Sequence, residues 1–215
     1  MSTAAKAQGK RAQAKETKGA KVSRKEKMVA AAEALLRERG IGGVTTRAIA
    51  EAVPCSEGAI YVHFKDRLEL LLAVLQQALP EMLAPLHELD EKAGKATPEQ
   101  NLTFALAGLI RFHDRVAPML CSLLTEHELL RRFRQSLEGA GKGPHRGIAT
   151  LAHYIEKEQK LGRIAAQVDA KTAAAVLMAS SFFHVFTSQL LGAQSRLDTK
   201  RLVAFSIRCP DPAIP

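Results

Sequence analysis

The hydrophobic positions of this chain recur mostly at intervals of three and four residues, which is the period of an amphipathic α-helix. Apolar side chains from Met28 to Leu36 occupy one such face. Ser23 opens a capping box before this face and Gly40 provides a stop behind it, so a helix is predicted over about 23–39. Because convincing alternating runs and Asn-Gly or Asp-Gly hairpin turns are lacking, the pattern predicts an all-α fold with about nine helices.

A second capping pattern opens a long helix. Asp66 and Glu69 begin an apolar repeat that continues to Leu86. Pro80 and Pro85 lie inside this repeat. An interior proline removes a backbone hydrogen bond and clashes with the preceding turn, so a kink or an end of the helix is expected there.

Further helices are predicted towards the end of the chain. A cap with a first-turn proline at 97–100 opens one helix, and Pro118 is expected to open another that lasts to about Phe133. The glycine-rich stretch 139–147 is expected to be a loop. Three more helices should follow, one ending near 161, one over about 169–192 and one over about 198–207.

Two short helices joined by a tight turn fit residues 45–64. Thr45 or Thr46 can cap the first helix, Pro54 helps to end it, and Ser56 can cap the second. This arrangement is the helix-turn-helix unit, whose second helix places its N-terminal side chains against base edges in the DNA major groove. Gly58 weakens that helix, which makes sense where the backbone approaches a partner closely.

Positive charge indicates a polyanionic partner. The formal net charge is +9, and nine basic against two acidic residues fall within positions 1–27. Residues 1–22 contain almost no bulky apolar side chain, so we expect a disordered basic arm. Such an arm can lie along DNA phosphates or can be a solvated tail, and both interpretations stay open.

The cysteine and hydropathy patterns favour a cytoplasmic protein without a metal or cofactor. Cys55, Cys121 and Cys209 are far apart, which argues against a disulfide framework and a zinc site. The N-terminal segment has no apolar stretch of the kind found in secretory signals. Residues 172–195 are uncharged and long enough to cross a membrane, but their hydroxyl, imidazole and amide groups favour a buried or interface helix.

Enzyme motifs are incomplete in this sequence. The run from His127 to Arg131 has arginine where a zinc-protease helix needs a second histidine. The glycines at 139–143 lack the spacing and the preceding strand of a phosphate-binding loop. No Ser-His-Asp set or carboxylate pair stands out, so the chain is not expected to be an enzyme.

The region from Lys25 to Leu75 resembles the tetracycline-repressor (TetR) family of bacterial regulators; beyond it the similarity is architectural. The matching features are a helix that starts at threonine, Ile49-Ala50, Ser56-x-Gly58, Tyr61-x-His63-Phe64 and a basic residue at Arg67. Two positions depart from the family pattern. Pro54 replaces the usual turn glycine, which leaves the backbone of the turn open, and Arg67 replaces the usual lysine, which changes contact geometry.

The resemblance implies a DNA-binding domain over 23–72, a ligand-binding and dimerisation domain over 73–208 and a tail over 209–215. Phosphate contacts are implied for Thr46, Tyr61, His63 and Arg67. Base-edge contacts are implied for Glu57, Ala59 and Val62, and Glu57 can accept from a cytosine amino group. The complete set expected at DNA is Thr46, Arg47, Ser56, Glu57, Gly58, Ala59, Tyr61, Val62, His63, Lys65 and Arg67. The alternative makes Tyr61, His63 and Phe64 plain core and cap residues.

By the same resemblance, we expect a homodimeric repressor that binds a palindromic operator and is released by a small effector. A DNA-binding protein without an effector is the structural alternative, and an enzyme is the third. Apolar and imidazole side chains suggest an effector pocket, although core packing explains most of them equally well. The candidates are Phe104, Phe112, His113, Met119, Leu123, His127, Met178, Phe182 and Phe183.

The helical runs 102–110 and 172–193 contain no carboxylate, so we expect a neutral or anionic, largely apolar effector, with His113 or His127 as a polar anchor. Pro80 is where motion of the long helix is expected to concentrate. The helices over 169–192 and 198–207 carry surplus apolar faces that a second copy can bury. The expected interface residues are Phe186, Leu190, Leu202 and Phe205, with an intrachain core as the alternative.

Overall fold

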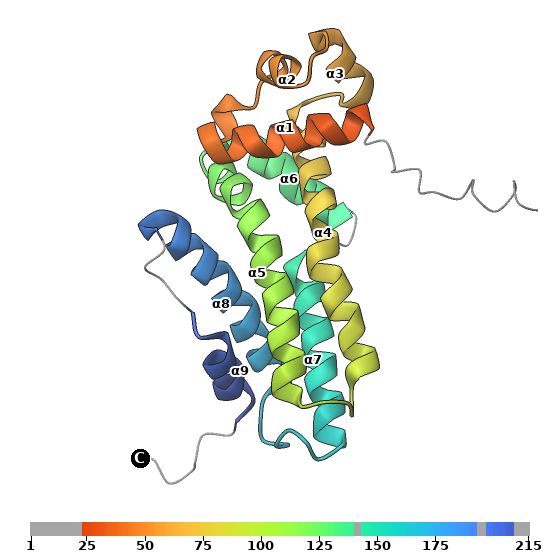
Figure 1. The fold of residues 1–215 in the computed structure, drawn as a ribbon, viewed down its shortest axis with the longest axis vertical. Coiled ribbons are helices and arrows are strands. Elements are labelled where there is room, and N and C mark those ends of the chain that lie inside the picture. Colours follow the sequence, from red (N-terminus) through yellow and green to blue (C-terminus); the bar gives the residue numbers. More distant parts are fainter. Residues whose placement is uncertain (1–22, 140–142, 193–196, 209–215) are drawn as a thin grey trace, which may run out of the picture.

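The computed structural model describes residues 23–139, 143–192 and 197–208, and within these ranges the chain is all-α (Figure 1). Its helices are α1 (Arg24–Arg39), the short 3-10 helix η1 (Ile41–Gly43), α2 (Thr46–Ala52), α3 (Glu57–His63), α4 (Arg67–Lys92), α5 (Pro98–Leu123), α6 (His127–Gly139), α7 (Pro144–Lys160), α8 (Ala170–Leu191) and α9 (Thr199–Ile207). The predicted fold class is confirmed. The expected basic arm and C-terminal tail lie outside the described residues.

Capping side chains set most of the helix starts where the sequence placed them. The Ser23 hydroxyl accepts from the backbone N–H of Glu26, and the Glu26 carboxylate accepts from the N–H of Ser23. Thr97 and Gln100 make the same reciprocal pair at the start of α5. The carboxylates of Asp66, Asp169 and Asp198 cap α4, α8 and α9, respectively. Each cap satisfies a backbone donor that has no partner within its helix.

The prediction that Pro118 opens a helix is wrong. α5 continues through Pro118 to Leu123, and α6 begins only at His127. Pro118 cannot donate to the carbonyl of Asp114 one turn earlier. That carbonyl accepts instead from the Gln189 side-chain amide of α8, at 3.3 Å. The neighbouring helix thus compensates for the missing backbone bond.

Two more helix boundaries differ from the sequence prediction. α4 runs unbroken through Pro80 and Pro85, so neither proline ends it. The expected loop over 139–147 is too long, because α7 begins at Pro144. Gly147 is buried within α7, where an added Cβ would lie 2.6 Å from Met178 Cε. This glycine therefore serves close packing of α7 on α8 and not a turn.

The helices form a small N-terminal unit and a larger body (Figure 1). The unit of α1, α2 and α3 lies at one end, and α4 runs from it along the body beside α5 and α7. α8 and α9 lie on one side of the body and pack against α5. One continuous apolar core extends from Met28 in α1 to Val203 in α9. The N-terminal unit is therefore seated on the body by apolar contacts as well as by the long helix.

Gly108 allows the closest approach of α5 to α4. A Cβ added there would lie 2.6 Å from Pro85 Cγ and 2.7 Å from the backbone oxygen of Glu81. We predict that Gly108→Ala lowers the free energy of unfolding by about 1–3 kcal/mol, although alanine favours helices. Urea unfolding measures this difference. Gly58→Ala is the matched control, because a Cβ there would meet no atom closer than 3.9 Å; a Gly108→Ala protein as stable as this control would contradict the packing argument.

Candidate functional site

The second helix of the helix-turn-helix unit, α3, presents its outer face to solvent. Thr45 caps α2 and Ser56 caps α3, each through a side-chain oxygen that accepts a first-turn N–H. Ile49, Ile60 and Phe64 are buried and fix α3 against α2 and α1. The outward residues of α3 include large apolar groups that the fold leaves uncovered, since Tyr61 is 59% and Val62 is 80% exposed.

The turn before α3 does not need glycine. No residue from Val53 to Ser56 has a positive φ, so Pro54 is compatible with the turn backbone. Gly58, the second residue of α3, is exposed, and the space around its Cα is open within the protein. Its lack of a side chain is therefore not required by packing. An external surface that approaches the start of α3 closely is a physical reason for a glycine here.

The other expected DNA-contacting residues lie on or near this face. Arg47 and Lys65 are exposed, whereas Ala59 and His63 are half-buried. Arg47 forms an ion pair with Glu51 one turn later, at 3.1 Å. Thr46 donates its hydroxyl hydrogen to the Glu57 carboxylate at 2.6 Å. The two side chains that were given separate roles towards phosphate and base are thus bonded to each other across the turn.

Arg67 has a different position from the one expected of a phosphate contact. Its guanidinium donates to the backbone oxygen of Ile41 in η1 and lies 3.7 Å from the Glu126 carboxylate, just before α6. Its side chain is 34% exposed. In the DNA-free protein its cationic group therefore ties η1 and α4 to the body, and its contact with the phosphate backbone stays a prediction.

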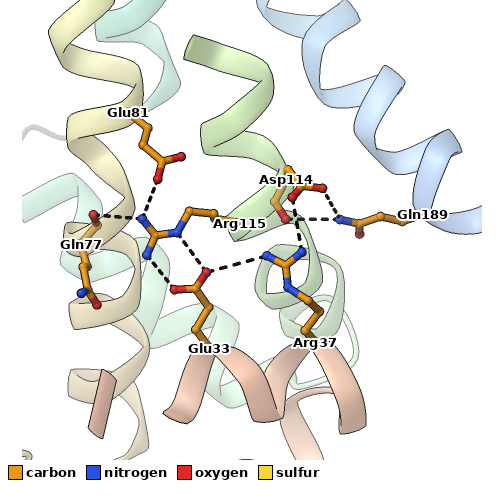
Figure 2. Close-up of polar contacts among 7 residues, drawn as sticks. All are labelled: Glu33, Arg37, Gln77, Glu81, Asp114, Arg115 and Gln189. Atoms are coloured by element: carbon orange, nitrogen blue, oxygen red, sulfur yellow. Dashed lines mark hydrogen bonds and ion pairs between the residues drawn. The ribbon is translucent and has the colours of Figure 1, made fainter. Parts of the chain in front are cut away.

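An ion-pair cluster that the sequence analysis missed joins α1 to the body (Figure 2). Arg115 of α5 binds both carboxylate oxygens of Glu33 in α1, at 2.7 and 3.0 Å. The same guanidinium lies 2.8 Å from the Glu81 carboxylate of α4. Hydrogen bonds to Glu33, and then to Glu81, raise the pKa of Arg115, so it stays charged. One half-buried side chain thus connects three helices across the domain junction.

A second set of contacts extends this cluster to α8 (Figure 2). Arg37 of α1 pairs with Asp114 of α5 at 3.3 Å, and the Gln189 amide donates to the Asp114 carboxylate at 3.4 Å. On the opposite side of the N-terminal unit, Arg132 of α6 pairs with Asp66 at 2.5 Å. The Arg132 hydrogen bond lowers the pKa of Asp66. Polar contacts to α5 and α6 therefore hold the N-terminal unit on the body, and Gln189 of α8 binds the same Asp114 that Arg37 contacts.

The structure separates the nine residues that were expected to form an effector pocket. Phe112, Met119, Leu123 and Met178 are buried in the core, and His113 is buried beside the half-buried Phe182. Phe104, His127 and Phe183 are exposed and lie on three different helices. The Lys92 ammonium covers the Phe104 ring at 3.6 Å. This set does not line one cavity, and its role towards a ligand stays a prediction.

His113 is buried and neutral. Its Nδ1 lies 2.9 Å from Ser181 Oγ, and that hydroxyl lies 2.7 Å from the backbone oxygen of Met178. Since the hydroxyl has one hydrogen to give to the carbonyl, His113 Nδ1–H is the donor to Ser181. Burial lowers the pKa of His113 from 6.5 to about 4.

This lowered pKa gives a pH-dependent stability. Between pH 6.5 and 4, His113 is protonated in the unfolded chain but stays neutral in the folded chain. The unfolded state therefore binds more protons, and acidification favours unfolding. The contribution is complete above pH 6.5, and on the order of 3 kcal/mol is lost as the pH falls to about 4. Urea unfolding at several pH values measures it. His113→Leu should flatten the profile in this window, and the exposed His87→Gln should not; equal profiles for both would refute the assignment.

A cavity of about 330 Å³ lies between α4, α5 and α8, beside the Arg115 cluster. Its lining residues are Glu81, Ile110, Arg111, Asp114, Arg115, His184, Val185 and Ser188. None of the nine expected pocket residues lines it. No local sequence pattern marks this cavity, because α8, which forms one of its walls, lies far along the chain from α4 and α5.

Three of the four expected dimer residues are exposed. Leu190 is 68%, Phe186 39% and Phe205 79% exposed, whereas Leu202 is half-buried. Phe183 and Leu191 add to the same uncovered apolar surface of α8. By length and composition α8 could also cross a membrane. In the described part of the chain, no cluster of three or more histidine, cysteine or acidic residues could hold a metal ion.

Comparison with known proteins identifies relatives of both parts of the chain. Residues 28–74 match the family described as bacterial regulatory proteins, tetR family. The HTH-type transcriptional repressor BepR of Brucella suis is 24% identical over 166 residues, which cover 76% of this chain and 79% of that protein.

Solved structures share the complete fold. The fatty acid degradation regulator FadR from Bacillus halodurans superposes with a TM-score of 0.61 at 18% identity, covering 86% of this chain and 93% of FadR. A TetR-like transcriptional regulator from Rhodococcus sp. RHA1 gives a TM-score of 0.61 at 19% identity, with 86% and 94% coverage. At these identities the match concerns the fold, and it includes the larger helical body.

Proposed function

We propose that this chain, whose residues 28–74 match the tetR family of bacterial regulatory proteins, is a ligand-responsive repressor that binds a palindromic DNA operator as a homodimer. Proteins of this family are DNA-binding transcriptional regulators and not enzymes. The cytoplasm, where DNA is accessible, is the compartment that this function requires.

The observation that carries the proposal is the uncovered outer face of α3. A helix of seven residues, capped by Ser56 and held by Ile60 and Phe64, exposes Tyr61 and Val62 to solvent. Large apolar groups exposed on so short a helix are costly unless a partner covers them. Base edges and thymine methyl groups in the major groove provide such a partner. Arg47 and Lys65, both exposed, supply cations for the flanking phosphates.

The exposed apolar face of α8 and α9 supports the dimer. Phe183, Leu190 and Phe205 are each more than half exposed, although they are among the most apolar side chains of the chain. Packing against a second copy about a two-fold axis buries this surface once on each subunit. Such an axis places two copies of α3 on the DNA with the symmetry of a palindrome.

The effector acts on the seating of the N-terminal unit. A ligand that binds the body shifts the protein towards release only if it prefers the conformation that does not bind DNA. The Arg115 and Asp114 clusters, which join α1 to α4, α5 and α8, are where such a preference can arise. The proposed effector is neutral or anionic and largely apolar.

Selection of duplexes from a random DNA pool tests this function. We expect the full-length protein to enrich one two-fold symmetric sequence whose affinity falls steeply with salt, because counterions return to the phosphates. Val62→Glu should abolish enrichment without unfolding the protein, since Val62 is 80% exposed. Enrichment of no sequence at physiological salt, or the same enrichment by the variant, would contradict the proposal.

A further inference from the structure

The cavity between α4, α5 and α8 combines apolar walls with polar groups that lack partners. Ile110 and Val185 form apolar parts of its lining. Its volume of about 330 Å³ lies at the lower end of the range for small-molecule sites, roughly 300–1,000 Å³. Arg115 is one of its lining residues, and Figure 2 shows how this side chain bridges α1 to the body.

The charges around the cavity leave a cation available. Both of its acidic residues are already paired, Glu81 with Arg115 and Asp114 with Arg37. Arg111 also lines the cavity, and it forms no ion pair with any other residue that the structure describes. A cationic ligand would have to displace an arginine from its carboxylate, whereas an anionic ligand finds Arg111 free.

A buried polar atom in the same cavity also has no partner. His184 Nδ1 is buried and makes no hydrogen bond within the described chain. An unpaired buried nitrogen is unfavourable, and a ligand that hydrogen-bonds it is one physical explanation for its presence beside a cavity. Arg111 and His184, which lie on α5 and α8, respectively, both line this one small cavity.

We propose that this cavity binds a small carboxylate with an apolar body, held by Arg111 and Arg115 through its anionic group and by His184 through a polar atom. Arginine binds carboxylates in a planar, two-pronged geometry, which favours a carboxylate over an alcohol or amide. The apolar body lies against Ile110 and Val185. This ligand deepens the proposed function, on which its regulatory part rests, because it names the site and the chemical class of the effector.

The position of Arg115 links this site to DNA binding. Arg115 is bonded to Glu33 of α1 at 2.7 Å, and a bound carboxylate competes with Glu33 for the same guanidinium. Weakening this bond loosens the N-terminal unit on α4 and α5. The ligand binds more tightly when the Glu33–Arg115 ion pair is broken. By thermodynamic reciprocity, bound ligand therefore favours the conformation in which this ion pair is broken.

Calorimetric titration of the full-length protein tests the site without DNA. The probes are phenylacetate, 4-phenylbutyrate and hexanoate, each compared with its own primary amide. At least one carboxylate should bind about tenfold more tightly than its amide, and Arg111→Gln should remove that difference. Arg134→Gln, which changes an exposed arginine of α6 outside the cavity, should preserve it. No preference for any carboxylate, or a preference that survives Arg111→Gln, would overturn the site.

The variant His184→Leu shows whether His184 binds the ligand or stabilises the fold, because thermal midpoint and carboxylate binding are measured on the same protein. Because Nδ1 is unpaired in the free protein, the variant should keep or raise the thermal midpoint, by up to about 2–4 °C, while it weakens carboxylate binding. A lower midpoint with unchanged binding would assign His184 to the fold and contradict its part in the site.

Adding the bound carboxylate to a protein–operator complex then tests the regulatory step. Release by the carboxylate but not by its amide supports the coupling through Arg115, and an intact complex at saturating ligand overturns it while the binding site stands. Failure of the protein to bind any operator would overturn the proposed function alone, since the calorimetric result does not depend on DNA.

Discussion

Replacing Leu190 with glutamate should convert the protein from a dimer to a monomer and lower its operator affinity by about a hundredfold or more. Leu190 is 68% exposed, near the C-terminal end of α8 and on the same helix as Phe183 and Phe186. In the proposed dimer its side chain is buried against the second copy, where a carboxylate without a partner is strongly unfavourable. A monomer binds only one half-site of the operator, so the binding free energy contributed by the second subunit is lost.

Analytical ultracentrifugation at micromolar concentration measures the first effect, and DNA titration measures the second. Leu161→Glu is the matched control, because Leu161 is also an exposed leucine, 56% accessible at the end of α7, and lies outside the proposed interface. It should remain a dimer with normal affinity. A stable wild-type monomer, or a Leu190→Glu variant that still sediments as a dimer, would refute the interface.

Adding a side chain at Gly58 should separate folding from DNA binding. Gly58→Ala should stabilise the fold by about 0.5–1 kcal/mol, since the Cβ meets open space and alanine favours the helix. Gly58→Leu should keep the fold but lower operator affinity about tenfold or more, because its side chain holds the start of α3 away from the groove. A gain in stability for Gly58→Ala together with a loss of operator affinity for Gly58→Leu would indicate that this glycine serves DNA binding and not folding.

Chemical unfolding and operator titration on the same preparations give the two quantities. Gly139→Leu, at the exposed end of α6 where an added Cβ also meets no atom, is the control and should bind operator normally. Equal operator affinity for Gly58→Leu and the wild type would mean that α3 does not enter the groove in the proposed orientation.

Local signals in the sequence predicted the helices well. Ser23, Asp66 and Thr97 cap helices where they were expected to, because a cap depends only on residues three or four positions away. The prediction at Pro118 was wrong because the carbonyl that this proline leaves unpaired, that of Asp114, is bonded by Gln189, 75 residues after Asp114 in the chain. Tertiary context therefore decided this boundary, which local rules assigned incorrectly.

The sites between helices could not be read in the same way. Glu33 and Arg115 are 82 residues apart, and nothing local to either marks the other as its partner. The role of Arg67 was taken from the family resemblance, which does not reveal its contacts with Ile41 and Glu126 in the DNA-free protein. The aromatic residues grouped as an effector pocket divide between core and surface, because apolar composition alone does not distinguish a cavity wall from packing.

The most direct test of the account is a footprint of the full-length protein on a duplex recovered by selection. We expect two equal protected segments related by two-fold symmetry, with centres about one turn of the DNA helix, or about 34–36 Å, apart. We also expect one dimer, and not two independent monomers, to occupy the pair. A single asymmetric protected segment, or protection that Leu190→Glu reproduces at the wild-type concentration, would contradict this account.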